Sequence, residues 1–140
     1  LGASGIYPLM SCRSVVRLGR ADAEKKSAKW FEKYVEAIKQ SSNLSKFEMP
    51  PVSDISDFLS NSGGFEVKLV ASLRENASPI YKVLKSAGVD FAKSACVLIG
   101  PEGDLSDAEY DAAESAGFIP VKLGDNVMKC DTAAACALSV

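Results

Sequence analysis

Two apolar runs of strand length constrain the fold more than any other feature of this sequence. The runs are "VKLVASL" (67–73) and "ACVLIG" (95–100). Near-continuous apolar runs are typical of strands buried on both faces of a parallel sheet, whereas a half-exposed strand alternates apolar and polar residues. Parallel neighbours need a crossover, and "SPIYKVLKSAG" predicts one as a helix opened by Ser78 and Pro79 and closed by Gly88. The sequence therefore predicts an α/β fold with a parallel sheet.

The rest of the chain continues the alternation of strand and helix. "SDAE" is a capping box that starts a helix at Ser106, because the hydroxyl can accept from the Glu109 amide while the Glu109 carboxylate reaches back. This helix ends at Gly117. The other predicted elements are a strand over 5–10, a helix over Asp22–Ser41, an extended segment over 46–52, a short helix over Ser53–Leu59, a strand over 118–124 and a final helix with Asp131 or Thr132 in its first turn.

The composition fits one globular domain without a metal site or a membrane span. The chain has 140 residues, of which 47% are hydrophobic and 24% charged. No apolar run approaches the roughly 20 residues that cross a bilayer. The four cysteines lack paired spacing, and there is no histidine to complete a metal site, so we expect buried free thiols in a reducing compartment: Cys12, Cys96, Cys130 and Cys136. The expected location is the cytoplasm, or an organellar stroma or matrix in a eukaryote.

Basic charge is concentrated at the front of the chain. Residues 1–46 hold 9 Lys/Arg against 4 Asp/Glu, a net of +5, whereas residues 47–140 hold 7 against 14, a net of -7. Either a phosphate-facing patch or a solvated helix face explains the first group, which includes Arg13, Arg17, Arg20, Lys25, Lys26 and Lys29. Trp30 and Tyr34 can stack on a base, but their helical spacing favours the core.

Glycine turns follow two of the predicted strands, at Gly100 and Gly124. Ligands of open α/β sheets bind beyond the carboxyl ends of the strands, and glycine lets the backbone approach a ligand closely. Glu102, Asp104 and Asp125 place negative charge beside these turns, although capping and turn formation also explain such residues. A neutral or cationic ligand bound mostly by backbone groups fits better than a phosphate.

Several motifs resemble the RsmE family of small-subunit ribosomal RNA methyltransferases. "IGPEG", the Ser-x-x-Glu helix start, "AGF", "LG" and "MKCDTA" occur in the family's order, where the segment reads I-G-P-E-G-G and then L-G-x-R-I-L-R-T-E-T-A. "IYPLMSCRSVV" and "EAIKQSSN" resemble the family's I-x-P-L-x-S-E-R-S and E-A-x-x-Q-S-x-R. The resemblance covers nearly the whole chain.

The resemblance implies a SPOUT-type domain over residues 1–140, with a parallel sheet flanked by helices and a C-terminal trefoil knot. It implies a homodimer that binds S-adenosyl-L-methionine and methylates N3 of one uridine in the 16S-type RNA of the small ribosomal subunit. The family's N-terminal PUA-like barrel, an RNA-binding module, matches no segment of this chain. We therefore expect the chain alone to bind ribosomal RNA weakly.

The matching positions assign candidate residues to the cofactor and to catalysis. One wall of the cofactor pocket would consist of Leu98, Gly100, Glu102 and Gly103, and the other of Leu123, Gly124, Val127, Met128 and Lys129. Lys129 is also the candidate for stabilising the uracil anion, because a cation near a carbonyl oxygen would do so. Arg13 is a second candidate, acting from the partner subunit or on phosphate. A surface cation on a turn is the structural alternative for both.

The chain departs from the family pattern at several positions. Asp104 replaces the second glycine of the G-G pair, Asn43 and Asn126 stand where the family has arginine, and charge type is kept at Lys129 and Asp131. These departures leave open a catalytically inactive or diverged SPOUT relative that only binds RNA or cofactor. An unrelated flavodoxin-like or nucleotide-binding module is a further alternative, which the acidic turns disfavour.

Overall fold

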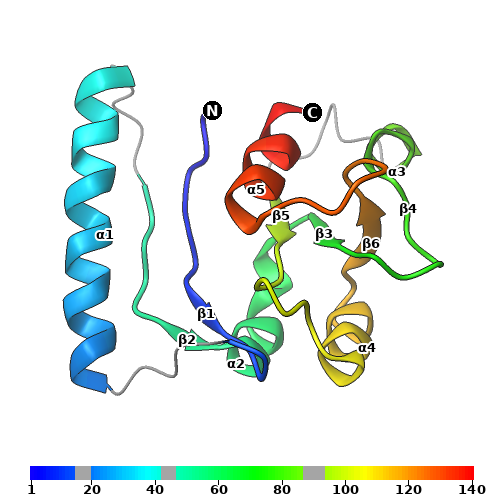
Figure 1. The fold of residues 1–140 in the computed structure, drawn as a ribbon, viewed down its shortest axis with the longest axis horizontal. Helices are drawn as coiled ribbons and strands as arrows, with labels where there is room; N and C mark the ends of the chain where they lie inside the picture. The colour runs from blue at the N-terminus through cyan, green and yellow to red at the C-terminus, as the bar shows by residue number, and fades with distance from the viewer. Residues whose placement is uncertain (15–19, 42–46, 87–93) are drawn as a thin grey trace.

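A four-stranded parallel sheet forms the centre of the chain. The structure, a computed structural model, describes residues 1–14, 20–41, 47–86 and 94–140 (Figure 1). The sheet has the order β4-β6-β3-β5, and every neighbouring pair is parallel. This confirms the predicted α/β fold. The strands are β3 (Val67–Ala71), β4 (Ser78–Pro79), β5 (Ala95–Leu98) and β6 (Ile119–Lys122).

The central strand, β3, pairs with β5 on one side and β6 on the other. Leu69 lies opposite Val97 in β5 and Ile119 in β6. Its side chain is 1% exposed and that of Val70 is 0% exposed, although successive side chains point to opposite faces of the sheet. Burial on both faces explains why this segment reads as one continuous apolar run.

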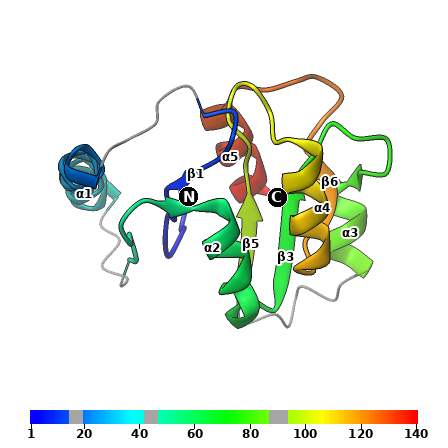
Figure 2. The same ribbon diagram turned by 90° about the horizontal axis from the view of Figure 1, so that it is seen from below.

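Helices cover both faces of this sheet. α2 (Ile55–Ser60) and α4 (Asp107–Ser115) lie below the strands in Figure 1 and in front of them in Figure 2, and α3 (Ile80–Ser86) and α5 (Cys130–Ser139) lie above. On the α2 and α4 side, the core consists of Ile55, Leu59, Val70, Leu98, Leu105, Tyr110, Ala113 and Phe118. On the α3 side, it consists of Val67, Leu69, Ile80, Val83 and Val121.

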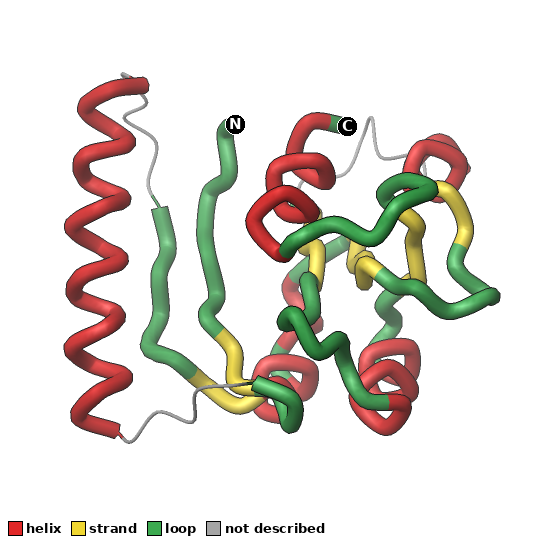
Figure 3. The backbone as a smooth tube through the Cα atoms, in the orientation of Figure 1, coloured by secondary structure: helices red, strands yellow, loops and turns green. Residues whose placement is uncertain are grey.

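The N-terminal third forms a separate layer beside the sheet. β1 (Leu9–Met10) pairs in parallel with β2 (Ser53–Asp54), and Gly5 forms a bridge with Glu48. These extended segments run between α1 (Arg20–Ser41) and the four-stranded sheet (Figure 3).

The sequence placed three of these elements imprecisely. The predicted strand over 5–10 is regular for only two residues, and the short helix predicted over Ser53–Leu59 begins at Ile55, because the two preceding residues pair with β1. The crossover helix also begins two residues later than predicted, at Ile80, because its first two predicted residues form β4 and pair with β6. The predicted α1 is confirmed. Gly88, the predicted end of α3, lies outside the described residues.

Both predicted ends of α4 are confirmed. Ser106 Oγ accepts from the Glu109 amide, and the Glu109 carboxylate accepts from the Ser106 amide at 2.8 Å, which is the capping box. At the other end, the Gly117 amide donates to Glu114 O and the Phe118 amide to Ala113 O, both at 2.9 Å. This pair of hydrogen bonds is a Schellman motif, and it needs the left-handed φ of 87° that Gly117 adopts.

Replacing this glycine should destabilise the fold through its backbone. We expect Gly117→Ala to lower the free energy of unfolding by about 1 kcal/mol, because a Cβ is unfavourable at positive φ. Gly117→Asn should lose less, because asparagine tolerates this region. Urea unfolding followed by circular dichroism measures both. The new Cβ meets only the flexible end of Lys68, at 3.3 Å, so steric crowding should add little to the effect. Equal stability of the alanine variant and the wild type would contradict the backbone explanation.

Candidate functional site

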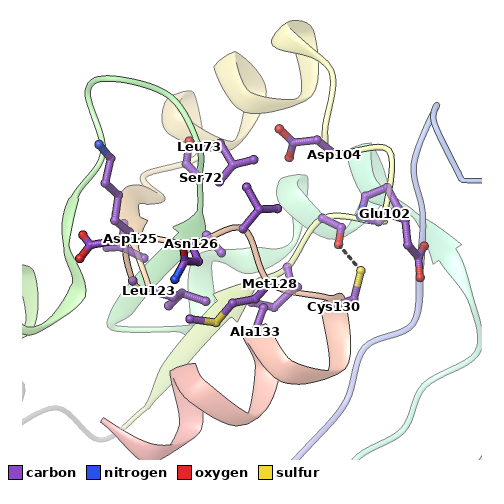
Figure 4. A pocket seen from close by; sticks show the side chains of 18 residues that line it. Ser72, Leu73, Glu102, Asp104, Leu123, Asp125, Asn126, Met128, Cys130 and Ala133 are labelled. Carbon is purple, nitrogen blue, oxygen red and sulfur yellow. Dashed lines mark hydrogen bonds between the residues drawn. The ribbon is translucent and has the colours of Figure 1, made fainter.

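A cavity of about 310 Å³ lies at the carboxyl ends of β3, β5 and β6, against the first turn of α5 (Figure 4). In an open parallel sheet, a ligand crevice forms at this edge beside a strand from which the chain connections lead to neighbouring strands on opposite sides. Here β3 is that strand, with β5 on one side and β6 on the other. The cavity is lined by Ala71, Ser72, Leu73, Ile99, Gly100, Pro101, Glu102, Asp104, Val121, Lys122, Leu123, Gly124, Asp125, Asn126, Val127, Met128, Cys130 and Ala133.

The lining residues form three walls, of which the sequence predicted two. Numbered in chain order, the second wall, residues 99–104 after β5, and the third wall, residues 123–128 after β6, contain the predicted glycine turns. The first wall, residues 71–73 at the end of β3, has no counterpart among the predicted site residues. The sequence predicts a buried strand over 67–73, and the carboxyl end of that strand is the signal that identifies this wall.

The predicted cofactor residues divide into two groups. Six of the nine line the cavity: Gly100, Glu102, Leu123, Gly124, Val127 and Met128. The other three do not. Leu98 is 5% exposed and belongs to the core beneath the sheet, because its side chain faces α2 and α4. Gly103 and Lys129 are exposed next to lining residues.

Neither glycine of the two turns has a left-handed φ. A Cβ on Gly124 would stand 3.0 Å from Met128 Cε, and one on Gly100 would stand 3.3 Å from Asp104 Oδ1 and from the side chain of Leu105. Close packing therefore favours glycine at position 100, whereas at position 124 the contact is with the flexible end of Met128. Neither position needs glycine for an unusual backbone conformation.

Asp104 is the one described residue other than glycine with a positive φ, at 61°. Its Oδ1 accepts from the Leu105 amide at 2.8 Å and from the Tyr110 hydroxyl at 2.7 Å. Burial and the hydrogen bond to Asp104 raise the pKa of Tyr110 to about 12, so the hydroxyl stays protonated and donates. These bonds explain how the chain accommodates aspartate where the family pattern has glycine.

α4 ties the first two walls together. The Tyr110 hydroxyl also lies 3.3 Å from Ala71 O at the end of β3. Arg74, next to the wall formed by residues 71–73, lies over the Tyr110 ring at 4.8 Å and pairs with three acidic side chains of α4: Asp107 at 2.9 Å, Asp111 at 2.8 Å and Glu114 at 3.4 Å. The position of each wall is thus linked to the same helix.

The cavity lining carries net negative charge. Glu102, Asp104 and Asp125 line it together with one basic residue, Lys122. Cys130 lines it as well, and its Sγ donates to Gly100 O at 3.1 Å. Burial and the nearby Glu102 raise the pKa of the Cys130 thiol, so it is neutral. The arrangement suits a ligand with positive charge and apolar surface.

The two predicted catalytic cations lie beside the cavity walls. Arg13 donates to Gly103 O at 3.2 Å and to Leu105 O at 3.3 Å, which places its guanidinium on the outside of the second wall. The adjacent Cys12 amide donates to the Glu109 carboxylate at 2.8 Å. Lys129 is the N-cap of α5, and its side chain is exposed immediately before Cys130.

The predicted basic patch is only partly described. Lys25, Lys26 and Lys29 lie on α1, and Arg17 lies outside the described residues, as do Asn43 and the side chain of Arg20. α1 stands on the opposite side of the molecule from β6 and α3 (Figure 1).

The two aromatic residues of α1 do not share one environment. The Tyr34 ring stacks on Phe47, with centroids 3.8 Å apart, and is half-buried, but it belongs to neither hydrophobic core. Trp30 is 37% exposed, so its predicted place in the core is wrong.

The four cysteines are free thiols. They are less buried than predicted, because Cys12 is exposed and the other three are half-buried. Within residues 1–14, 20–41, 47–86 and 94–140, no group of three or more potential ligands gathers at a metal-binding distance. In the same ranges, no helix is both long and apolar enough to cross a membrane.

Comparison with known families decides what kind of domain carries this cavity. The family model described as an RNA methyltransferase domain matches residues 1–140. The chain belongs to this RNA methyltransferase family. The alternative of an unrelated flavodoxin-like module is therefore wrong.

Individual relatives confirm the resemblance to RsmE. The chain is 30% identical to ribosomal RNA small subunit methyltransferase E of Bacillus subtilis, covering 99% of this chain and 55% of that protein. It is 29% identical to the enzyme of the same name from Mesomycoplasma hyopneumoniae, covering 96% and 56%. The crystal structure of the Neisseria gonorrhoeae enzyme of that name, bound to S-adenosyl methionine, superposes with a TM-score of 0.81 at 29% identity, covering 98% and 55%. The chain thus spans about half the length of these relatives.

The stability that Glu109 contributes, in part through its hydrogen bonds with the segment of Cys12 and Arg13, should depend on pH. Burial alone would raise the pKa of Glu109, but hydrogen bonds from the backbone and side chains of Ser106 and Cys12 hold it below the ordinary 4.5. The stability from this carboxylate is therefore present above pH 4.5 and is lost as the pH falls through the lower, folded-state value.

We expect Glu109→Gln to lower the free energy of unfolding by about 1 kcal/mol at neutral pH, with the difference from wild type shrinking as the pH falls below 4.5 and the carboxylate becomes protonated. Urea unfolding at a series of pH values measures this. Glu75→Gln is the control, since Glu75 is exposed and has no hydrogen bond to another described side chain. A constant difference in unfolding free energy between Glu109→Gln and the wild type at every pH would show that the carboxylate charge does not contribute to stability.

Proposed function

We propose that this chain is the cofactor-binding catalytic domain of an S-adenosyl-L-methionine-dependent methyltransferase that acts on small-subunit ribosomal RNA. The acidic cavity at three parallel strand ends, in a chain that belongs to an RNA methyltransferase family, is the observation that carries this proposal. The finer form is a SPOUT-type domain with a C-terminal trefoil knot that works as a homodimer and methylates N3 of a uridine. The RNA-binding barrel of the family would lie outside residues 1–140.

The cavity fits the proposed cofactor in size and charge. Its volume of about 310 Å³ is at the lower end of the range for small-molecule sites. Its acidic side chains complement a sulfonium cation, and the strand ends offer backbone groups to a nucleoside. When bound, S-adenosyl-L-methionine supplies a methyl carbon that its positively charged sulfur has already activated.

The predicted cofactor residues would have different tasks in holding the cofactor. Gly100 and Gly124 keep the walls free of side chains, while Leu123, Val127 and Met128 offer apolar surface on the third wall. Leu98 supports the second wall from the core and Gly103 from its outer side, where Arg13 binds its carbonyl.

Methyl transfer to a uridine nitrogen needs little more than position and charge. The proton on the ring nitrogen passes to solvent water, which leaves a uracil anion whose charge resides largely on the carbonyl oxygens. A nearby cation therefore stabilises the transition state. Lys129 is proposed for this task, because its exposed ammonium precedes the lining residue Cys130. Arg13 is proposed to contact a phosphate or a carbonyl oxygen. It would use the guanidinium N–H groups that do not donate to Gly103 O and Leu105 O.

Filling the cavity from the third wall should prevent cofactor binding. Gly124→Val adds a branched side chain where even a Cβ is 3.0 Å from Met128 Cε, so the cavity narrows. We expect S-adenosylhomocysteine to raise the melting temperature of the wild type but not that of the variant. The matched control is Gly63→Val, since a Cβ there meets no atom within 4 Å. A normal shift in a folded Gly124→Val protein would remove this site assignment.

The role of Lys129 is tested in the full-length protein with ribosomal RNA as substrate. Lys129→Met should reduce the rate of methyl transfer by roughly 10- to 1000-fold, the range for a lost charge-stabilising group, while S-adenosylhomocysteine affinity stays nearly unchanged. Lys82→Met, at an exposed position of α3, controls for the loss of one positive charge. An equal loss of rate and of cofactor affinity would make Lys129 a pocket residue instead.

A second candidate function is binding without catalysis. Asn126 lines the cavity where the family pattern has arginine, so one permanently charged donor is missing from the third wall. Mapping of modified uridines in the ribosomal RNA of a deletion strain separates the two functions. Loss of one methylated uridine supports the enzyme, and an unchanged pattern supports the binding protein.

A further inference from the structure

Asp104 places a carboxylate in the second wall of the cavity, at a position where the family pattern has glycine. The residue lines the cavity and is half-buried. Its φ of 61° is unfavourable for a side chain, and aspartate and asparagine are among the few residues other than glycine that tolerate it. A side chain at such a position is retained at a cost to the backbone, so its contacts are informative.

One carboxylate oxygen of Asp104 is held in place by two donors. Oδ1 accepts from the Leu105 amide at 2.8 Å and from the Tyr110 hydroxyl at 2.7 Å. Tyr110 is itself 2% exposed, so this donor cannot move away easily. Among the described residues, none donates to Oδ2. The carboxylate is therefore oriented by the protein while one oxygen stays available to a ligand.

The other acidic residues of the cavity are in a different position. Glu102 and Asp125 are exposed, so water and salt screen their charges and their side chains are free to turn away. Charge on a fixed and partly desolvated carboxylate acts more strongly on a ligand than charge on a mobile, exposed one. Asp104 should thus dominate the discrimination between ligands that differ in charge.

We infer that Asp104 is a specificity-determining residue that makes the cavity favour positively charged S-adenosyl-L-methionine over its neutral thioether product, S-adenosylhomocysteine. This inference rests on the proposed function. In the reaction, the lone pair of the deprotonated uridine N3 forms a bond to the methyl carbon while the bond between sulfur and that carbon breaks. The electron pair of the broken bond stays on sulfur, so the sulfonium charge disappears. The attraction to Asp104 is then lost with the methyl group, which weakens product binding relative to substrate binding.

Asparagine at this position separates charge from structure. In Asp104→Asn, the amide oxygen can still accept from Leu105 and Tyr110, and asparagine tolerates a left-handed φ, so only the charge is removed. Asp104→Gly removes the charge and both hydrogen bonds but restores the family residue and relaxes the backbone. Asp57→Asn, at an exposed position of α2 that does not line the cavity, controls for the change in net charge.

The experiment is isothermal titration of S-adenosyl-L-methionine and of S-adenosylhomocysteine into the full-length wild type and the three variants at low salt. We expect Asp104→Asn and Asp104→Gly to weaken S-adenosyl-L-methionine binding by roughly 3- to 10-fold, the scale of one partly screened charge, and S-adenosylhomocysteine binding by less than 2-fold. The Asp57→Asn variant should match the wild type for both ligands.

The outcomes separate this inference from the function on which it rests. If neither ligand binds the wild type, the proposed function fails. If both bind, but the Asp104 variants weaken them equally or not at all, the proposed function stands and the charge discrimination is overturned. The glycine variant guards against a folding artefact, because a loss in Asp104→Asn that Asp104→Gly does not share would reflect the amide group rather than the missing charge.

Discussion

The rest of the structure depends on the position of β3 between two parallel neighbours. A shift of this strand by one residue would exchange Leu69 and Val70 between the two faces, and both hydrophobic cores would lose a side chain that is almost fully buried. The register of β3 with both β5 and β6 would change at the same time. Because residues 71–73 continue from this strand, its register also determines where the first wall of the cavity stands.

α4 converts this backbone frame into a site of defined shape. Its N-terminal turn binds the Cys12 segment through Glu109, and Tyr110 reaches both Ala71 and Asp104. A single surface ion pair contributes little to stability. Arg74, however, pairs with three acidic side chains of α4 and also lies over the Tyr110 ring. A network of this kind contributes mainly to the relative placement of its members, here the end of β3 and the loop after β5.

The features that the sequence predicted are those encoded by neighbouring residues. The capping box at Ser106, the helix end at Gly117 and the apolar run around Leu69 follow from local hydrogen bonding and periodicity. The two-residue strands β2 and β4 escaped prediction because they exist only through pairing across some forty residues. The left-handed conformation of Asp104 was also unpredictable, since it depends on Tyr110, a residue of the next helix. Helical spacing placed Trp30 in the core because it says which residues share a face, but not whether another element covers that face.

The three cavity walls come from strands that are adjacent in space but belong to separate crossover units of the chain. A molecule bound there would join segments near residues 72, 101 and 125 as a non-covalent cross-link. Partial unfolding of any one strand would destroy the whole site. Binding would therefore stabilise only the fully folded state, and neither the partly unfolded states nor the fully unfolded one. Occupancy of the cavity would therefore increase the cooperativity of the domain and slow amide exchange in all three strands together.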